Sequence, residues 1–431
     1  MKLWKKIPFE SLLVDSKDGE WGEGSPAVGL VESLIIRGTD FAGLNNPATE
    51  FPRRWVKEHI ADRKRLQPGD LILETAGGTS TQSTGRSVLL KKNFFDQHPD
   101  IPVLCASFSR HLRLDADRFS SRFIAYLLQA LYRGGYMAVF NIQHTGVSRF
   151  QYTSFKNHTK LTVPDREVQD KIAAILSAYD ELIETNQRRI DLLEKLAEEI
   201  YREWFVRLRF PGHEKVKFNT GLPTTWKCMR VGAIVNRHRF GKIYRSGDLQ
   251  SMGSVCVIDQ STDDYLGFYD GKPEHVASVD HPILLFGDHS CKMVFMTKPF
   301  SLAENVVPFT PCASVESAYF LFHLVRDLTR TTEYKRHWTD LTTREILVPD
   351  GLLQKQFGLV AKQLHEQRTV LLETNRHLAR TRDLLLPRLI SGKLSVEDLD
   401  IQFPPGMAED VGADDAQAPC SKRKAVKNSR K

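Results

Sequence analysis

The fold is decided by the stretch from Val163 to Phe205, VPDREVQDKIAAILSAYDELIETNQRRIDLLEKLAEEIYREWF. Its apolar residues recur at steps of three and four, which places them on one face of an α-helix. Glycine is absent, and proline occurs only at Pro164, where it suits the first turn of a helix. The pattern predicts one helix of about 40 residues, which would be about 60 Å long.

The chain repeats this pattern from Val348 to Leu394, VPDGLLQKQFGLVAKQLHEQRTVLLETNRHLARTRDLLLPRLISGKL. Both copies begin with V-P-D and carry E-T-N near the middle, which indicates an internal duplication. Because so long a helix cannot bury its apolar face against a small domain, we predict that the two helices pack side by side, antiparallel, as a coiled coil. The alternative is that each is a long core helix of its own domain.

The segments before the two helices also share an order of elements. Gly69 to Leu73 and His281 to Leu285 both read as a turn that leads into a buried strand, and an amphipathic helix follows later in each segment. We therefore predict an α+β protein with two globular α/β domains in pseudo-repeat, separated by two long antiparallel helices that form a coiled coil. The expected divisions are a first globular domain at 1–162, a first long helix at 163–210, a second globular domain at 211–347, a second long helix at 348–394, and a disordered tail at 395–431.

Composition narrows the class of protein. The six cysteines are scattered and form no C-x-x-C pair, which argues against a disulfide framework or a zinc site. There is no apolar run long enough to span a membrane and no signal peptide at the N-terminus, so we expect a soluble, cytoplasmic protein. The net charge of +7 favours a polyanionic partner without proving one.

Catalytic motifs are missing from the sequence. The loop GGTSTQSTGRS from Gly77 to Ser87 has misspaced glycines for a phosphate loop, and Asp70 before a strand is more typical of a turn than of a nuclease site. Neither N-P-P-Y nor D-P-P-Y occurs, although a chain that methylates adenine would be expected to carry one. We therefore expect a non-enzymatic protein that binds no cofactor and no metal itself.

The polar loops of the two globular domains are better suited to binding DNA than to catalysis. Base edges are read by arginine, lysine, amide and hydroxyl side chains, with cations around them for phosphates. The clusters NRHRFGKIYR and EYKRHW interleave cations with aromatic residues, as a phosphate track does, although a solvated surface explains any single residue equally well. The candidate DNA-contacting residues are Thr79, Gln82, Thr84, Arg86, Arg133, Tyr136, Gln143, His144, Arg149, Arg237, Arg239, Lys242, Tyr244, Arg245, Lys292, Lys335, Arg336 and His337.

Nearly the whole chain, from Trp4 to about Leu394, resembles the specificity subunit of type I restriction–modification systems. The resemblance is carried by Leu222 to Trp226 (LPTTW), by the helix VPDREVQDKIAAILSAYDELIETN, by the closing segment from His144 to Pro164 and by LLPRLISGKL. It implies two target recognition domains that each read half of a split DNA site, with the helices as spacer and as docking surface for two methyltransferase subunits. It further implies that partner subunits bind S-adenosylmethionine and methylate adenine, and that motor–nuclease subunits use ATP and Mg²⁺.

A different class of function stays open: a coiled-coil scaffold whose globular domains bind proteins instead of DNA. The two are separated by salt, because DNA binding through several phosphates weakens steeply as salt rises.

Two amides interrupt the apolar faces of the long helices. Asn186 lies between Leu182 and Ile190, and Asn375 lies near the midpoint of the second helix. If helices of similar length pair antiparallel, their midpoints meet, so we expect the two amides to face one another and to fix the register, as a lone polar residue does in other coiled coils.

Overall fold

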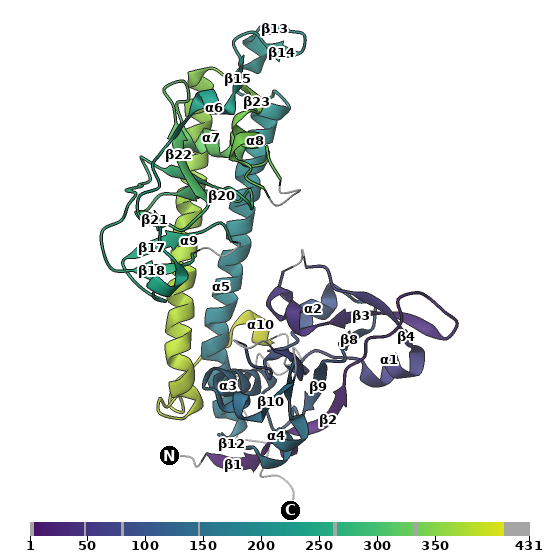
Figure 1. The fold of residues 1–431 in the computed structure, drawn as a ribbon. Coiled ribbons are helices and arrows are strands. Elements are labelled where there is room, and N and C mark those ends of the chain that lie inside the picture. Colours follow the sequence, from purple (N-terminus) through teal and green to yellow (C-terminus); the bar gives the residue numbers. More distant parts are fainter. Residues whose placement is uncertain are drawn as a thin grey trace, which may run out of the picture. The chain divides into compact units, whose positions relative to one another are not determined.

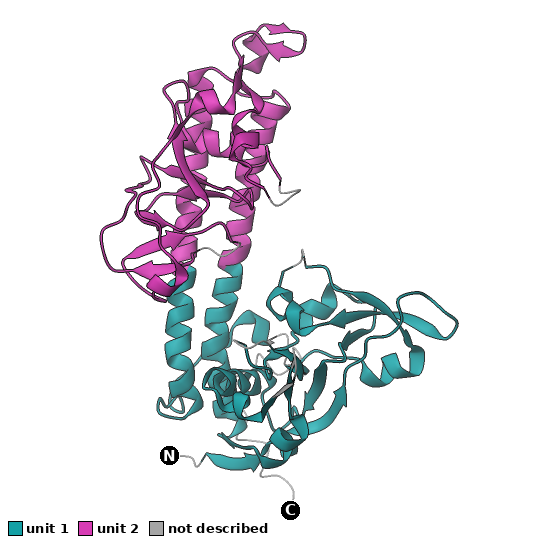
Figure 2. Cartoon of the chain, viewed as in Figure 1, with its two compact units in different colours: residues 1–185, 375–431 teal, residues 186–374 magenta. Residues whose placement is uncertain are grey.

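The computed structural model describes residues 4–46, 49–78, 82–144, 147–261, 265–330 and 335–408, except for the side chains of 143, 144, 147 and 408. The chain forms two compact units, one of residues 1–185 with 375–431 and one of residues 186–374 (Figure 2). The two long helices (Figure 1) each contribute residues to both units (Figure 2). Each unit therefore contains one globular part and a portion of each helix.

The long helices are α5 (Arg166–Tyr201), which continues into a π-helical turn (Arg202–Val206), and α9 (Gly351–Ile390). Each begins just after its V-P-D. The backbone carbonyl of Asp165 accepts the N–H groups of Val168 and Gln169, and the Asp350 carboxylate caps the N–H of Leu353 at 3.0 Å. The valine of each V-P-D ends a short strand instead, so the helices begin three residues later than the sequence pattern alone suggests.

Contacts between α5 and α9 show that the helices run antiparallel in each unit. In unit 1, Arg382 Nη1 lies 2.5 Å from Asp180 Oδ1, and Asn375 Nδ2 donates to the carbonyl of Ile183 at 3.2 Å. In unit 2, Arg368 pairs with Glu194, and other residues nearer the end of α5 contact the beginning of α9. The expected antiparallel helix pair is confirmed.

The globular part of unit 1 contains a four-stranded antiparallel sheet, a three-stranded sheet and a two-stranded ladder. The order of the larger sheet is β2 (Leu13–Asp18), β9 (Ser109–Leu114), β5 (Leu71–Glu74) and β7 (Ser87–Leu89). The smaller is β4 (Arg53–Lys57), β3 (Leu30–Ile36) and β8 (Val103–Cys105), in which β3 and β8 are parallel. The ladder pairs β1 (Lys5–Pro8) with β12 (Lys160–Val163), directly before α5.

Unit 2 repeats all three pairings. Its larger sheet has the order β16 (Val235–Arg237), β22 (Val306–Pro311), β19 (Ile283–Gly287) and β20 (Met293–Met296). Its smaller sheet is β18 (Gly267–Tyr269), β17 (Val255–Ile258) and β21 (Phe300–Leu302), again with one parallel pair. The ladder β15 (Lys227–Arg230) with β23 (Glu345–Val348) precedes α9. The predicted pseudo-repeat of two α/β domains is confirmed by these three matching pairings.

Short helices complete each globular part. The corresponding ones are α3 (Ser121–Arg133) and α4 (Tyr152–His158) in unit 1, and α7 (Ala318–Val325) and α8 (Trp338–Thr342) in unit 2. Unit 1 also contains α1 (Glu58–Lys64) and α2 (Lys92–Asp96), and unit 2 contains α6 (Val231–Ile234). The main core of each unit joins its sheet, its short helices and the long helices: Phe123 and Ile172 share one core, and Phe320 and Phe357 share the other.

The segment after α9 corrects one expectation. Residues 395–408 were expected to belong to a disordered tail, yet Val396 and Met407 are buried in the core of unit 1. Lys171 Nζ donates to the Glu397 carbonyl at 2.7 Å, and a last helical turn, α10, spans Pro405–Ala408. The segment is acidic on the whole, which favoured disorder, but its few apolar residues are enough to hold it against the core of unit 1. Residues 409–431 lie outside the described residues.

Candidate nucleic-acid interface

In unit 2, the segment before α8 is fixed to the turn between β19 and β20. Asp288 Oδ1 accepts the N–H of Trp338 at 2.8 Å, and its backbone carbonyl accepts the N–H of His337 at 2.8 Å. His289 Nδ1 lies 3.0 Å from the Lys335 carbonyl. These contacts hold the backbone of residues 335–338 in place. The exposed side chains of Lys335 and Arg336 therefore extend from a fixed stretch of backbone.

This anchoring brings together the two basic sequence clusters. The guanidinium of Arg237, on β16, lies 5.1 Å from the ring of Phe240 and 6.0 Å from the ring of Trp338. We name the exposed residues Arg237, Arg239, Lys335 and Arg336 the basic cluster. Arg336 lies 3.9 Å from Asp288 and keeps 76% of its side chain exposed, so that contact leaves it accessible. Exposed cations beside aromatic rings suit phosphates and stacked bases.

The remaining unit 2 candidates differ in exposure. Lys242 lies 4.7 Å above the Tyr244 ring, which itself stacks on Tyr269 at 4.4 Å. Burial raises the pKa of Tyr244 to about 12, so this hydroxyl stays protonated. Arg245 keeps 81% of its side chain exposed despite a 3.5 Å contact with Glu304. Lys292 is half-buried.

His337 is a correction to the sequence-based set. It is 2% exposed, and its Nδ1 lies 3.1 Å from Asp340 Oδ2, a carboxylate that also pairs with Lys335 at 3.3 Å. The imidazole therefore has almost no surface for DNA and instead helps to orient the segment that carries the basic cluster.

In unit 1 the exposed candidates besides Arg133, whose side chain is 40% exposed, are Gln82, Tyr136 and Arg149. Arg149 lies on β11 (Val147–Phe150), between β10 (Asn141–His144) and β6 (Ala76–Gly78) in a three-stranded sheet. The Tyr136 hydroxyl lies 3.2 Å from Thr159 Oγ1. Thr79 and the side chains of Gln143 and His144 lie outside the described residues.

Three other unit 1 candidates are engaged within the fold. Thr84 is fully buried and bonds to Asn141, so it presents no atom to DNA and is a second correction. Arg86 forms two hydrogen bonds with Glu74, at 2.6 and 2.8 Å, and these raise its pKa. Arg133 lies 2.6 Å from Asp383 on α9.

One pairing was missed from the sequence. The Arg110 guanidinium lies 4.1 Å from the ring of Tyr152, the first residue of α4, much as Arg237 lies over Trp338, the first residue of α8. The arginine in each pair comes from a distant strand, so spacing along the chain does not reveal it. The signal for this pairing that the sequence does contain is the aromatic residue at the start of α4 and of α8.

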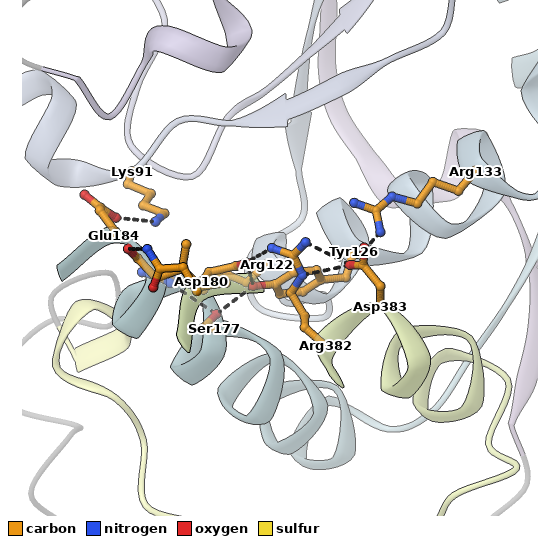
Figure 3. A network of polar contacts seen from close by, with 11 residues as sticks. Lys91, Arg122, Tyr126, Arg133, Ser177, Asp180, Glu184, Arg382 and Asp383 are labelled. Carbon is orange, nitrogen blue, oxygen red and sulfur yellow. Dashed lines mark hydrogen bonds and ion pairs between the residues drawn. The ribbon is translucent and has the colours of Figure 1, made fainter. Parts of the chain in front are cut away.

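A polar network attaches the globular part of unit 1 to its helices (Figure 3). Arg122, Tyr126 and Arg133 follow one another along one face of α3. Arg122 Nη1 contacts Ser177 at 3.2 Å and Glu181 at 3.3 Å, and the Tyr126 hydroxyl donates to Asp180 at 2.5 Å. Figure 3 shows side chains of α3 and α5 meeting Arg382 and Asp383 of α9.

The network also reaches Lys91, which precedes α2, and the C-terminal segment at Gly406. Lys91 lies 3.5 Å from Glu184, and the Arg122 guanidinium donates to the backbone carbonyl of Gly406. Glu181 in turn accepts the Gly406 N–H at 3.3 Å. The C-terminal segment is therefore part of the attachment.

The attachment in unit 2 is mainly aromatic. Phe205 lies 4.9 Å from Phe320 and 5.3 Å from Phe357, measured between ring centroids. His365 on α9 lies 4.9 Å from the ring of Phe295 and 5.8 Å from that of Tyr319. Beside the apolar core of each unit, the polar network is therefore a feature of the attachment in unit 1, and the cluster of aromatic rings is a feature of the attachment in unit 2.

No helix in the described ranges is both long enough and apolar enough to cross a bilayer. Within the same ranges, no three histidine, cysteine, aspartate or glutamate side chains gather at distances suited to a metal ion.

Comparison with known proteins finds similar proteins of one kind. Residues 60–195 match the model of the type I restriction modification DNA specificity domain. The type I restriction enzyme MjaIX specificity subunit of Methanocaldococcus jannaschii is 26% identical over 283 residues, which cover 56% of this chain and 62% of that protein. The putative MjaX specificity subunit of the same organism is 21% identical over 66% of this chain and 71% of its own length.

The fold agrees. The structure of the S subunit of a type I restriction-modification system from M. genitalium covers 90% of this chain and 96% of its own, with a TM-score of 0.56 at 17% identity. Residues 60–195 thus match the type I restriction modification DNA specificity domain, and the chain is similar in sequence and in fold to type I specificity subunits.

Proposed function

We propose that this protein is the DNA specificity subunit of a type I restriction–modification complex and that each globular part reads one half of a split DNA site. The observation that carries the proposal is the basic cluster of unit 2, in which an anchored backbone presents exposed cations beside Trp338 and Phe240. Phosphate contacts of this kind position a protein on DNA, and nearby polar side chains read the bases.

The repeat supports a split site. Two readers with the same strand order and different loops suit two different half-sites, since loops change more freely than the scaffold beneath them. The helices α5 and α9 are rigid elements on which methyltransferase subunits dock in this proposal. S-adenosylmethionine, ATP and Mg²⁺ belong to the partner subunits, because the motifs for that chemistry are absent from this sequence.

The basic cluster is tested by changing Arg237, Arg239 and Arg336 together to Ala in the full chain assembled with its partner methyltransferase subunits. Each lost phosphate contact should reduce the slope of log affinity against log salt by about 0.9. Lys215, Lys217 and Lys227, three exposed cations elsewhere in unit 2, changed to Ala are the matched control, which removes the same charge. Equal slopes for the two variants would remove the cluster from the interface.

The proposal that each unit reads its half-site independently is tested by exchanging residues 1–160 for those of a relative and sequencing the methylated adenines. We expect one half of the recognised site to change while the other half and the gap persist. If both halves change, the units do not read independently. If binding to DNA does not depend on salt at all, the scaffold function is favoured instead.

A further inference from the structure

Gln169 lies in the first turn of α5 and is 1% exposed. Its Oε1 accepts the backbone N–H of Ser120 at 2.9 Å, and its Nε2 donates to the carbonyl of Pro164 at 2.9 Å. Ser120 is the N-cap residue of α3. One side chain therefore joins the start of α3, the strand-to-helix junction and the long helix.

Gln354 repeats this arrangement in unit 2. Its Oε1 accepts the N–H of Glu316 at 2.9 Å, its Nε2 donates to the carbonyl of Pro349 at 2.8 Å, and it is 1% exposed. Glu316 directly precedes Ser317, the N-cap residue of α7. The two glutamines stand at the same distance from their V-P-D in the sequence.

The surroundings of the two glutamines have diverged. In unit 1 the start of α3 is followed by Arg122, in a network of charges, whereas α7 contributes Tyr319 and Phe320 to a cluster of rings. The glutamine bridge, in contrast, has the same pattern in both units: the amide oxygen accepts a backbone N–H at the start of a short helix, and the amide nitrogen donates to the proline carbonyl of V-P-D. A contact that persists while its neighbours change points to a geometric constraint instead of a general need for stability.

The chemistry of the bridge requires a glutamine. The side chain must accept a hydrogen bond at one atom and donate one at another, both from a buried position. Glutamate would turn a second oxygen toward the proline carbonyl, asparagine is one methylene shorter, and methionine neither donates nor accepts an equivalent bond.

We propose that Gln169 and Gln354 are positioning residues that fix the orientation of each globular part on the long helices. Resting on the proposed function, this makes them determinants of the gap between the two half-sites. The orientation of each reader on its helix sets where its DNA-contacting surface lies, so a loosened bridge permits more than one gap length.

The test uses the full chain assembled with its partner methyltransferase subunits and the variants Gln169→Met, Gln169→Glu and Gln354→Met. Gln187→Met on α5 and Gln363→Met on α9 are matched controls, because both glutamines are exposed. The first readout is amide hydrogen exchange. We expect about five- to tenfold faster exchange at residues 119–123 in Gln169→Met and at 315–320 in Gln354→Met, each without change in the other unit.

The glutamate variant keeps the acceptor for the Ser120 N–H but turns an oxygen toward the Pro164 carbonyl, so it too should exchange faster than wild type. Gln354→Met keeps the test informative if a Gln169 variant does not fold, because it probes the same bridge in the other unit. Unchanged exchange in both variants of Gln169 would overturn the bridge.

The second readout is methylation of DNA whose half-sites are separated by the preferred gap or by one base pair more or less. We expect each bridge variant to lose at least threefold of its preference for the native gap, while the controls keep theirs. Faster exchange with an unchanged gap preference would show a merely structural role and overturn the proposal. If wild type itself shows no sequence-specific methylation, the proposed function fails, while the exchange experiment still decides whether the bridge orients the globular parts.

Discussion

Asp180 and His365 occupy equivalent positions in the two copies of the long helix, each seventeen residues after the valine of its V-P-D, yet they make opposite kinds of contact. Asp180 accepts the Tyr126 hydroxyl and pairs with Arg382, both at 2.5 Å. His365 is packed against the rings of Phe295 and Tyr319. One position therefore carries a charge in unit 1 and a largely buried neutral ring in unit 2.

The pH dependence of unit 2 follows from this burial. Desolvation lowers the pKa of His365 from 6.5 to about 4, with a further contribution from Arg368, so the folded protein takes up this proton less readily than the unfolded chain. The stabilising effect is present above pH 6.5 and is lost as the pH falls toward 4. From His365 alone we expect a loss of about 2 kcal/mol in the free energy of unfolding between pH 7 and 5, at 1.36 kcal/mol per unit.

Denaturant titrations of wild type and His365→Phe at both pH values check this expectation. The phenylalanine keeps the ring contacts and does not titrate, so its loss over the same range should be smaller. His323, whose pKa burial lowers to about 3, still contributes to the loss in both proteins. Equal losses in the two proteins would contradict the role given to His365.

The network of unit 1 is probed by Tyr126→Phe. This change removes only the hydroxyl that donates to Asp180, a hydrogen bond to a charged acceptor, and should cost about 1.5–3 kcal/mol. Tyr179→Phe is the control on α5, since the Tyr179 hydroxyl makes no hydrogen bond within the described part of the chain. Thermal unfolding measures both, and equal shifts of the two melting temperatures would show that the Tyr126 hydroxyl contributes nothing specific.

The C-terminal segment should stabilise unit 1. Truncation after Leu394 removes Val396 and Met407 from the core and takes away the Gly406 carbonyl that Arg122 contacts. Loss of two buried side chains predicts a cost of several kcal/mol. Truncation after Ala408 keeps all of these contacts and should leave the unfolding transition in place. Proteolysis rates of unit 1 in the two truncated chains, compared with full length, measure the difference.

The two helix amides give a prediction about register. Asn186 is 3% exposed, and Asn375 donates to the carbonyl of Ile183. That the two amides face each other stays a prediction. Changing both to Leu should leave thermal stability equal or higher while discrimination between gap lengths falls, because apolar helices slide past one another more easily than helices with a polar layer. A less stable double mutant that keeps its gap preference would refute the register role.

The sequence predicted those features that depend on periodicity. The long helices, their pairing and the repeated order of strands follow from apolar spacing and from two copies of V-P-D. The boundaries of the short elements were harder to predict from the sequence. The charged segment from Trp55 to Leu66 has the composition of a short helix, yet Trp55 lies in β4 because strand β3 pairs with it, and only Glu58–Lys64 form α1.

The candidate site was predictable only as a set of residue types. Thr84 and Arg86 have the composition of a DNA-reading loop, but Asn141 and Glu74, which engage them, lie elsewhere in the chain. The basic cluster likewise forms only because Asp288 anchors residues 337 and 338. Such pairings between distant segments decide which polar side chains remain exposed, and no spacing rule contains them.

The division of the chain has a consequence for the order of folding during synthesis. Unit 2 is one continuous segment, whereas unit 1 needs residues 375–408 to complete its helix pair and core. Domains usually fold as they emerge from the ribosome, at about 5–20 residues per second. The first globular part therefore leaves the ribosome early but waits roughly 10–40 s for its last helix, by which time the second unit has all of its own residues. The unit that is made first is the one that is finished last.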